Sequence, residues 1–337
     1  MGIRVSIVVP VYNSHATLPK CLDSLIAQTW QDLEIICIND KSKDNSIDII
    51  KEYQQKDSRV LLVDHADNMN AGGARNSGIR TATGEYVCFC DNDDWMTPDA
   101  IEILVKASNN GRIDFVLPQW CQYWNENKKT NMKNLIAGGT KKDNCDYALL
   151  HGFRMLGCLI RRSIFFNNNL FFPEKTFFED NAISSSLLHS ANEIMVVDKI
   201  LYYYQMVDGS SSRSFSLVKL SDRVRTTDMF VENMKRLGFI NSENEELVNY
   251  SYLHLSFNTI RTLAIVEESG AQGVLEIVAN KVKSKMPNMY VKDSTMKRVL
   301  EHPKCYYYTF RLKNRISRLI PGFIKKPLKA CIHKSSL

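Results

Sequence analysis

The chain has 337 residues, of which 44% are hydrophobic and 24% charged, with a formal net charge of +6. This is the balance of an ordinary globular protein with one large or two moderate domains. No run of 18 apolar residues occurs, and the N-terminal "MGIRVSIVVPVYN" lacks the features of a secretory signal, so we expect neither secretion nor a membrane span. The nine cysteines form no CxxC pair or metal-ligand spacing, which predicts reduced, mostly buried thiols and a cytoplasmic location.

The first third of the chain alternates between strand-like and helix-like segments. Short apolar runs rich in β-branched residues predict strands at residues 5–12, 33–40, 59–63 and 85–91. Helices are expected at residues 14–26, 42–53 and 97–107, and a glycine-rich turn followed by a helix is expected at 68–84. This alternation predicts a parallel sheet covered by helices on both faces.

The remaining two thirds are less regular and then become helical. Strands are expected at residues 113–120 and 193–205, a polar loop at 125–134, and a helix that begins at the acidic pair Glu179 and Asp180. From residue 217 the pattern is helical. We therefore expect an α/β domain at residues 1–216, in two halves (1–112 and 113–216), a helical region at 217–300, and a basic tail at 301–337.

Three carboxylates follow the fourth predicted strand in "CDNDDW". In an extended segment Asp91 and Asp93 would point to the same side, because side chains alternate with a period of two. Carboxylates at the end of a strand commonly bind Mg²⁺ or Mn²⁺, which they share with substrate phosphates. The alternative is a surface turn in which Asp94 caps a helix.

Polar residues also follow the first two predicted strands. Ligands of parallel sheets bind at the carboxyl ends of the strands, where this chain has Pro10, Tyr12 and Asn13 on the first strand and Asp40 on the second. Together they could form a slot for a planar base, although each alone would be ordinary turn chemistry.

The segment "NAGGARNSG" is a further candidate for ligand binding. Gly72 and Gly73 permit close approach of the backbone, and Arg75 could anchor a base or a phosphate. The segment lacks the G-x-G-x-x-G spacing, and no P-loop motif occurs in the chain, so the sequence supports neither a nicotinamide site nor a P-loop site.

Five motifs occur in the order and at about the spacing seen in family 2 glycosyltransferases with the GT-A fold: "VSIVVPVYN", "EIICIND", "NAGGARNSGI", "CDNDDW" and "FFED". The sequence resembles the bacterial enzymes of this family that build surface polysaccharide or lipopolysaccharide glycans. The resemblance covers roughly residues 3–215. It implies a GT-A fold, a mostly parallel mixed sheet flanked by helices, with a nucleotide-binding half at 1–112 and an acceptor-side half at 113–216.

The resemblance assigns roles to the residues at the strand ends. It implies that Pro10, Tyr12 and Asp40 bind uridine and that Arg75 helps to hold the nucleotide. Asp91 would bind the ribose, and Asp93, with Asp91, would hold Mn²⁺ or Mg²⁺. Asn92 stands where the family usually has a serine.

The resemblance also places the catalytic acids. The family's catalytic base is the aspartate of its "ED" pair, here Asp180, which follows Glu179. The residue-based alternative is that both acids only stabilise a helix N-terminus. Arg213 could clamp the diphosphate, or it could lie in a mobile surface loop; Gln205 stands where many relatives have a basic residue.

These residue types fit one reaction. A bound metal can neutralise the leaving nucleoside diphosphate, and a carboxylate on the opposite face can take the proton of an attacking hydroxyl, which inverts the anomeric centre. We therefore expect a metal-dependent hexosyl- or N-acetylhexosaminyltransferase that moves a sugar from a UDP-sugar to a saccharide acceptor, expected to be lipid-linked. A sugar-nucleotide nucleotidyltransferase and a catalytically silent sugar-nucleotide-binding scaffold are the alternatives.

The tail after Glu301 carries nine Lys or Arg and no Asp or Glu. On a helix its apolar residues would share one face, and three arginines would lie mostly on another: Leu312, Ile316, Leu319 and Ile320, against Arg311, Arg315 and Arg318. Such a helix either binds an anionic membrane surface, here the inner face of the cell membrane, or packs on its own protein. No motif for nucleic-acid binding occurs.

Overall fold

The structure is a computed structural model, and it describes residues 2–206, 216–263, 269–285 and 303. The chain divides into two compact units, one of residues 1–214 and 225–251 and the other of residues 215–224 and 252–337. None of the helices that the structure describes is both long and apolar enough to cross a bilayer. The seven cysteines in the described residues are all buried and free.

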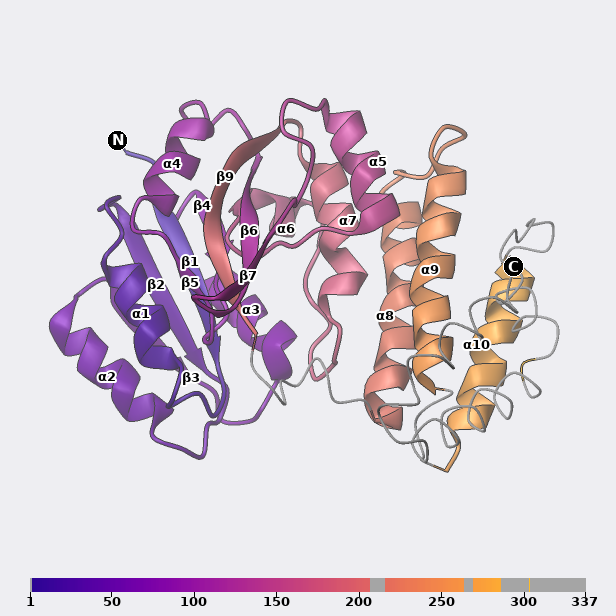
Figure 1. The fold of residues 1–337 in the computed structure, drawn as a ribbon, viewed down its shortest axis with the longest axis horizontal. Helices are drawn as coiled ribbons and strands as arrows, with labels where there is room; N and C mark the ends of the chain where they lie inside the picture. Colours follow the sequence, from indigo (N-terminus) through magenta and orange to yellow (C-terminus); the bar gives the residue numbers. More distant parts are fainter. Residues whose placement is uncertain (1, 207–215, 264–268, 286–302, 304–337) are drawn as a thin grey trace. The chain divides into compact units, whose positions relative to one another are not determined.

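The first unit is built on one mixed sheet with the strand order β3-β2-β1-β4-β8-β6-β9-β5, and β7 pairs with β6 (Figure 1). The strands are β1 (Val5–Val11), β2 (Leu33–Asn39), β3 (Val60–Asp64), β4 (Tyr86–Phe89), β5 (Trp95–Met96), β6 (Phe115–Asn125), β7 (Lys128–Met132), β8 (Leu159–Arg161) and β9 (Ile194–Gln205). The pairings among β3, β2, β1 and β4 are parallel, as the alternating sequence pattern predicted. The strand β8 pairs antiparallel with β4 on one side and with β6 on the other, and so connects the parallel strands to the rest of the sheet.

Helices cover both faces of this sheet. Alternate residues of β1 point to opposite sides, so that Ile7 and Val9 pack in one hydrophobic cluster and Val8 in another. The first cluster includes residues of α1 (Leu18–Ile26), α2 (Ser46–Lys56) and α4 (Ala100–Ala107). The second includes residues of α3 (Asn70–Thr81), α5 (Lys141–His151), α6 (Ser163–Asn167) and α7 (Asp180–Ser190). The predicted α/β fold with helices on both faces is confirmed.

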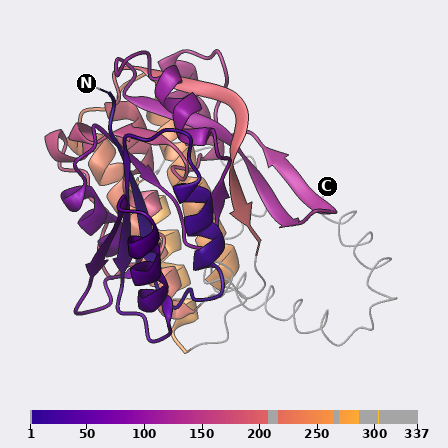
Figure 2. The ribbon, with the colours of Figure 1, turned by 90° about the vertical axis from the view of Figure 1, so that its left-hand side faces the viewer.

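Two local predictions were wrong. Residues 128–132, predicted as part of a polar loop, form β7, which pairs antiparallel with β6; Figure 2 shows this hairpin in magenta. An edge strand that faces water can be polar, because its stability comes from ladder hydrogen bonds and not from a buried apolar face. Gly72 and Gly73 lie inside α3 and not in a turn before it; Gly72 leaves room for the close approach of residues 173–179 and is not needed for a turn.

The helical region predicted after residue 217 consists of α8 (Leu217–Arg236), α9 (Glu245–Leu263) and α10 (Ala271–Lys285). The second half of α8 and the start of α9 belong to the first unit. The second unit has a small apolar core of its own, formed by α10, the first part of α8 and the second part of α9, with Leu220, Ile260, Leu263, Ala271, Leu275 and Val278 at its centre.

Candidate functional site

The carboxyl ends of β1, β2 and β4 lie together, as parallel pairing requires. The backbone N–H of Asp40 donates to the carbonyl of Val11 at 2.8 Å, and the side-chain amide of Asn92 donates to the carbonyl of Pro10 at 2.8 Å. Tyr12 follows β1 and is 46% exposed. The structure therefore brings Pro10, Tyr12 and Asp40 to one edge of the sheet, as predicted. The hydrogen bond of Asn92 connects the turn that contains Asp91 and Asp93 to β1.

Asn13 connects two loops at this edge. It has a left-handed backbone conformation, with φ of 49°, which asparagine tolerates better than most residues. Its N–H donates to the Ser42 hydroxyl at 3.1 Å, and its Oδ1 accepts the N–H of Lys43 at 2.8 Å. Asn13 thus holds the loop after β2 against the loop after β1.

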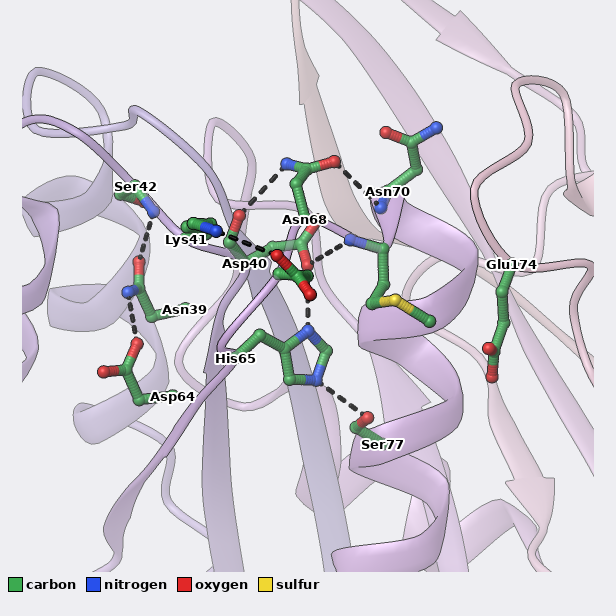
Figure 3. Close-up of polar contacts among 12 residues, drawn as sticks. Asn39, Asp40, Lys41, Ser42, Asp64, His65, Asn68, Asn70, Ser77 and Glu174 are labelled. Atoms are coloured by element: carbon green, nitrogen blue, oxygen red, sulfur yellow. Dashed lines mark hydrogen bonds and ion pairs between the residues drawn. The ribbon is translucent and has the colours of Figure 1, made fainter.

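Asp40 is 3% exposed and is held by hydrogen bonds on one oxygen. Its Oδ1 accepts the backbone N–H of Met69 at 2.8 Å and lies 2.8 Å from Nδ1 of His65 (Figure 3). The side chain of Asn68 donates to the carbonyl of Asp40 at 3.0 Å. Sequence reasoning missed His65, although its position directly after the third strand is the same signal that identified Asp40.

The segment Asp91–Asp94 is a turn and not the extended segment expected from the sequence. The N–H of Asp94 donates to the carbonyl of Asp91 at 3.1 Å, and the N–H of Asp91 donates to the hydroxyl of Tyr202 at 3.2 Å. β4 ends at Phe89, so the alternation of a strand does not continue through the carboxylates. It is the turn that decides where Asp91 and Asp93 point.

Asp94 is a structural residue. It is fully buried, its Oδ2 accepts the Tyr202 hydroxyl at 2.5 Å, and its Oδ1 accepts the N–H of Gln205 at 2.8 Å. Burial and the charges of Asp91 and Asp93 raise its pKa well above the usual range. The alternative expected from the sequence was right about the turn but wrong about the cap, because α4 begins only at Ala100, after Asp99.

Asp91 and Asp93 remain as two carboxylates that could bind a cation. The Asp91 side chain is 28% exposed, and one of its oxygens pairs with Arg75 at 2.8 Å. Burial, and then the charge of Asp91, raise the pKa of Asp93 to about 6. No group of three potential metal-binding His, Cys, Asp or Glu occurs in the described residues. Two hard oxygen ligands fit an ion that takes its other ligands from water and phosphates, as Mg²⁺ usually does.

Arg75 joins the two acidic segments of the site. This buried residue of α3 donates from one terminal nitrogen to Asp91 and from the other to Glu179. Burial lowers the pKa of its guanidinium, but the charges of Asp91 and Glu179 outweigh that effect and raise it. Arg75 thus brings together carboxylates that lie 88 positions apart in the sequence (179 − 91 = 88).

The acidic pair lies at the start of α7, as predicted. Glu179 occupies the N-cap position, Asp180 is the first helical residue, and Phe178 before them has a left-handed φ of 58°. Burial raises the pKa of Glu179, and the Arg75 charge only partly opposes this. Asp180 is exposed, and within the described residues its carboxylate accepts only the neighbouring N–H of Asn181.

The close approach of α3 to this segment explains one of the glycines. A Cβ on Gly72 would lie 2.6 Å from the carbonyl oxygen of Pro173 and 3.2 Å from Cβ of Glu179. The sequence predicted that the backbone at Gly72 allows a close approach. In the structure, the group that approaches it is the segment before α7, which contains Glu179. Arg213 and the tail from 304 onward lie outside the described residues.

Comparison with known proteins agrees with this geometry. Residues 6–166 match the family described as "Glycosyl transferase family 2". Over 212 residues the chain is 34% identical to the putative glycosyltransferase EpsH of Bacillus subtilis, a match that covers 60% of each chain. Over 210 residues it is 32% identical to the poly(ribitol-phosphate) beta-glucosyltransferase of Bacillus spizizenii, covering 60% of this chain and 32% of that protein. The chain therefore spans less than two thirds of the length of these relatives.

The fold has a counterpart among solved structures. Residues 1–349 of TarS from S. aureus superpose with a TM-score of 0.71 at 19% identity, and the match covers 93% of this chain and 91% of that one. The fold is thus of the GT-A type with a helical C-terminal region, as the sequence motifs predicted.

Proposed function

We propose, since residues 6–166 match the family described as "Glycosyl transferase family 2", that this chain transfers a sugar from a UDP-sugar to a hydroxyl of a saccharide acceptor with inversion of the anomeric centre. The observation that carries the proposal is the convergence on Arg75 of the Asp91 turn, at the end of β4, and the Glu179–Asp180 pair, at the start of α7. One site thereby holds carboxylates suited to a cation and a separate, exposed carboxylate suited to a proton.

The nucleotide is assigned to the edge formed by β1 and β2. Tyr12 offers an exposed ring and Asp40 a carboxylate oxygen to a base, with Pro10 and Asn13 completing the slot. A structure of TarS has been solved in complex with UDP-GlcNAc, which supports a UDP-sugar as the donor here. Arg213 remains a proposed phosphate ligand.

Asp91 and Asp93 are the residues that would hold Mn²⁺ or Mg²⁺. The ion would supply positive charge that neutralises the leaving diphosphate without a proton transfer. Arg75 donates a hydrogen bond to Asp91, which holds that carboxylate in place and puts a buried positive charge close to it. The raised pKa of Asp93 fits this role, because a bound cation would offset both the burial and the charge of Asp91 that raise it.

Asp180 is the proposed catalytic base, and Glu179 a residue that positions it. The Glu179 carboxylate is paired with Arg75, whereas the exposed carboxylate of Asp180 can accept a proton from an acceptor hydroxyl. The acceptor hydroxyl attacks from the side opposite the leaving group only if Asp180 and the diphosphate lie on opposite sides of the sugar. The connection through Arg75 supports that arrangement.

The acceptor is proposed to be a lipid-linked glycan of a bacterial surface polysaccharide, and the transferred sugar a hexose or an N-acetylhexosamine. The name of the B. spizizenii relative, a glucosyltransferase acting on poly(ribitol-phosphate), supports a surface-polymer acceptor. A lipid-linked acceptor would place the protein at the inner face of the cell membrane, where the basic tail could bind.

The test is release of UDP from a panel of UDP-sugars with Mn²⁺, with and without a membrane extract as acceptor. We expect one donor to give extract-dependent release in the wild type, and both Asp180→Asn and Asp93→Ala to abolish it. Asp146→Asn, on the surface of α5, is the matched carboxylate control and should keep full activity. If UDP binds but Asp180→Asn turns over like the wild type, the assignment of the base is wrong.

A further inference from the structure

The buried carboxylate of Asp40 is held asymmetrically. Oδ1 lies 2.8 Å from two nitrogens, the backbone nitrogen of Met69 and Nδ1 of His65, whereas none of the described residues donates a hydrogen bond to Oδ2. Oδ2 is therefore the oxygen that is available to a ligand.

His65 lies between Asp40 and the helix α3. Its backbone N–H donates to the carbonyl of Asn39 at 2.9 Å, which fixes the residue at the end of β3. Its Nε2 lies 2.9 Å from the hydroxyl of Ser77, and Figure 3 shows the imidazole between the Asp40 and Ser77 side chains. The ring is thus held from both sides and from its backbone.

The Asp40 carboxylate decides which atoms of His65 and Ser77 donate hydrogen bonds and which accept them. A carboxylate oxygen accepts hydrogen bonds, so Nδ1 carries the proton that points to Oδ1. In the neutral imidazole Nε2 then accepts the proton of the Ser77 hydroxyl. Asp40 therefore selects the tautomer, and the Ser77 hydroxyl, which can donate as well as accept, matches it and holds the other side of the ring.

We propose that His65 is a positioning residue of the nucleotide site, which together with Ser77 holds Asp40 so that Oδ2 meets an N–H group on the edge of the donor's base. This inference rests on the proposed function. A uracil ring has an N–H at position 3, which can donate to Oδ2, whereas cytosine has a bare acceptor nitrogen there. His65 thus contributes to the preference for UDP over CDP without touching either nucleotide.

The experiment is calorimetric titration of the full chain with UDP and with CDP as probes. We expect His65→Leu to weaken UDP binding by about tenfold, as for loss of a hydrogen bond to a charged group. CDP binding should change by less than about twofold, so the UDP preference falls. His65→Asn keeps a side-chain N–H near the position of Nδ1 and should restore most of the preference. His151→Leu, an exposed histidine of α5, is the matched control.

A double-mutant cycle separates positioning from general structural damage. In an Asp40→Asn background, His65→Leu should cause little further loss of UDP affinity, because both substitutions remove the same interaction. Additive losses, or equal losses for UDP and CDP, would overturn the role of His65 while leaving the transferase proposal intact. If His65→Leu does not fold, Ser77→Ala carries the same test, with an expected loss of about threefold for UDP alone.

The two proposals fail in different ways. If wild-type protein binds neither nucleotide, the proposed function fails and the inference fails with it. If the wild type prefers UDP and Asp40→Asn removes the preference while the His65 and Ser77 variants keep it, only the inference fails.

Discussion

Arg75 shows how one buried side chain can organise a site. Its guanidinium donates to Asp91 and to Glu179, and each side chain of this trio is mostly buried. The pairing geometry uses two separate nitrogens of a planar group, which the single ammonium of lysine cannot reproduce. Arg75 therefore stabilises the fold and keeps the two acidic segments together.

We expect Arg75→Ala to destabilise the protein by about 3–5 kcal/mol, because it leaves two carboxylates without their partner. Chemical denaturation measures the change. Arg80→Ala is the matched control on the same helix, since its exposed pair with Glu174 at 3.6 Å should be worth less than about 1 kcal/mol. Equal costs for the two variants would contradict the account.

Asp93 illustrates a functional group that costs stability. Its folded-state pKa of about 6 lies above the ordinary aspartate value of 3.8, so ionisation of Asp93 disfavours the folded state at neutral pH. The cost falls as the pH drops below about 6, and it disappears only below the unfolded value of 3.8, where the Asp93 carboxyl is protonated in both folded and unfolded chains.

Asp93→Asn should therefore stabilise the metal-free protein at pH 7 by about 1–3 kcal/mol while abolishing transfer. Unfolding in the presence of a chelator measures this gain, which should shrink below pH 6 and vanish as the pH falls below 3.8. A less stable Asp93→Asn protein would show that the carboxylate is not under electrostatic strain.

At the scale of elements, α3 connects the parts of the site. It carries Arg75 and Ser77, and it lies against the segment before α7 where glycine leaves room. A side chain at Gly72 would have to push that segment away, because its Cβ would lie 2.6 Å from a backbone oxygen of Pro173.

Gly72→Ala should lower kcat by about 100-fold, because a shift of about 1 Å in the segment with Glu179 and Asp180 misplaces the base. Steady-state kinetics with the donor that the panel of UDP-sugars identifies measures the change. Gly273→Ala in α10, where an added Cβ meets nothing within 4 Å, should keep activity and gain up to about 1 kcal/mol in stability. A fully active Gly72→Ala enzyme would contradict this role for α3.

The helix α7 contains His189, whose protonation should make the stability of the protein depend on pH. Nδ1 of His189 lies 2.8 Å from the carbonyl of Ser185, the ring lies beside Phe239, and burial lowers its pKa. A lowered folded-state pKa means that the unfolded chain binds more protons below about pH 6.5.

The free energy of unfolding should therefore fall as the pH drops below about 6.5, and His189→Gln should reduce that slope. Urea denaturation at a series of pH values measures it, with His151→Gln as the exposed control. An unchanged slope in His189→Gln would show that other groups cause the acid sensitivity.

At the scale of the whole molecule, the sequence predicted the parts of the site that depend on parallel pairing. Polar residues after β1, β2 and β4 had to meet, because parallel strands end at the same edge. It did not predict the contacts that depend on tertiary packing. The pairing of Arg75 with Glu179, the hydrogen bond between His65 and Asp40 and the turn at Asp91 leave no periodic signal.

The edge strand β7 was missed for a related reason. Hydrophobic periodicity detects strands that bury one face, and the first four residues of β7 are exposed. By contrast, five ordered motifs were enough to predict the GT-A fold and the resemblance to glycosyltransferase family 2, which residues 6–166 match.

The central claim is that Asp40 and the Asp91–Asp93 pair belong to one site for a nucleotide and a metal. Calorimetric titration of UDP with and without Mn²⁺ tests it most directly. Mn²⁺ should tighten UDP binding by about tenfold or more in the wild type and in Asp180→Asn, and should have no effect in Asp93→Asn. UDP binding that ignores Mn²⁺ in the wild type, or that responds to Mn²⁺ equally in Asp93→Asn, would contradict the claim.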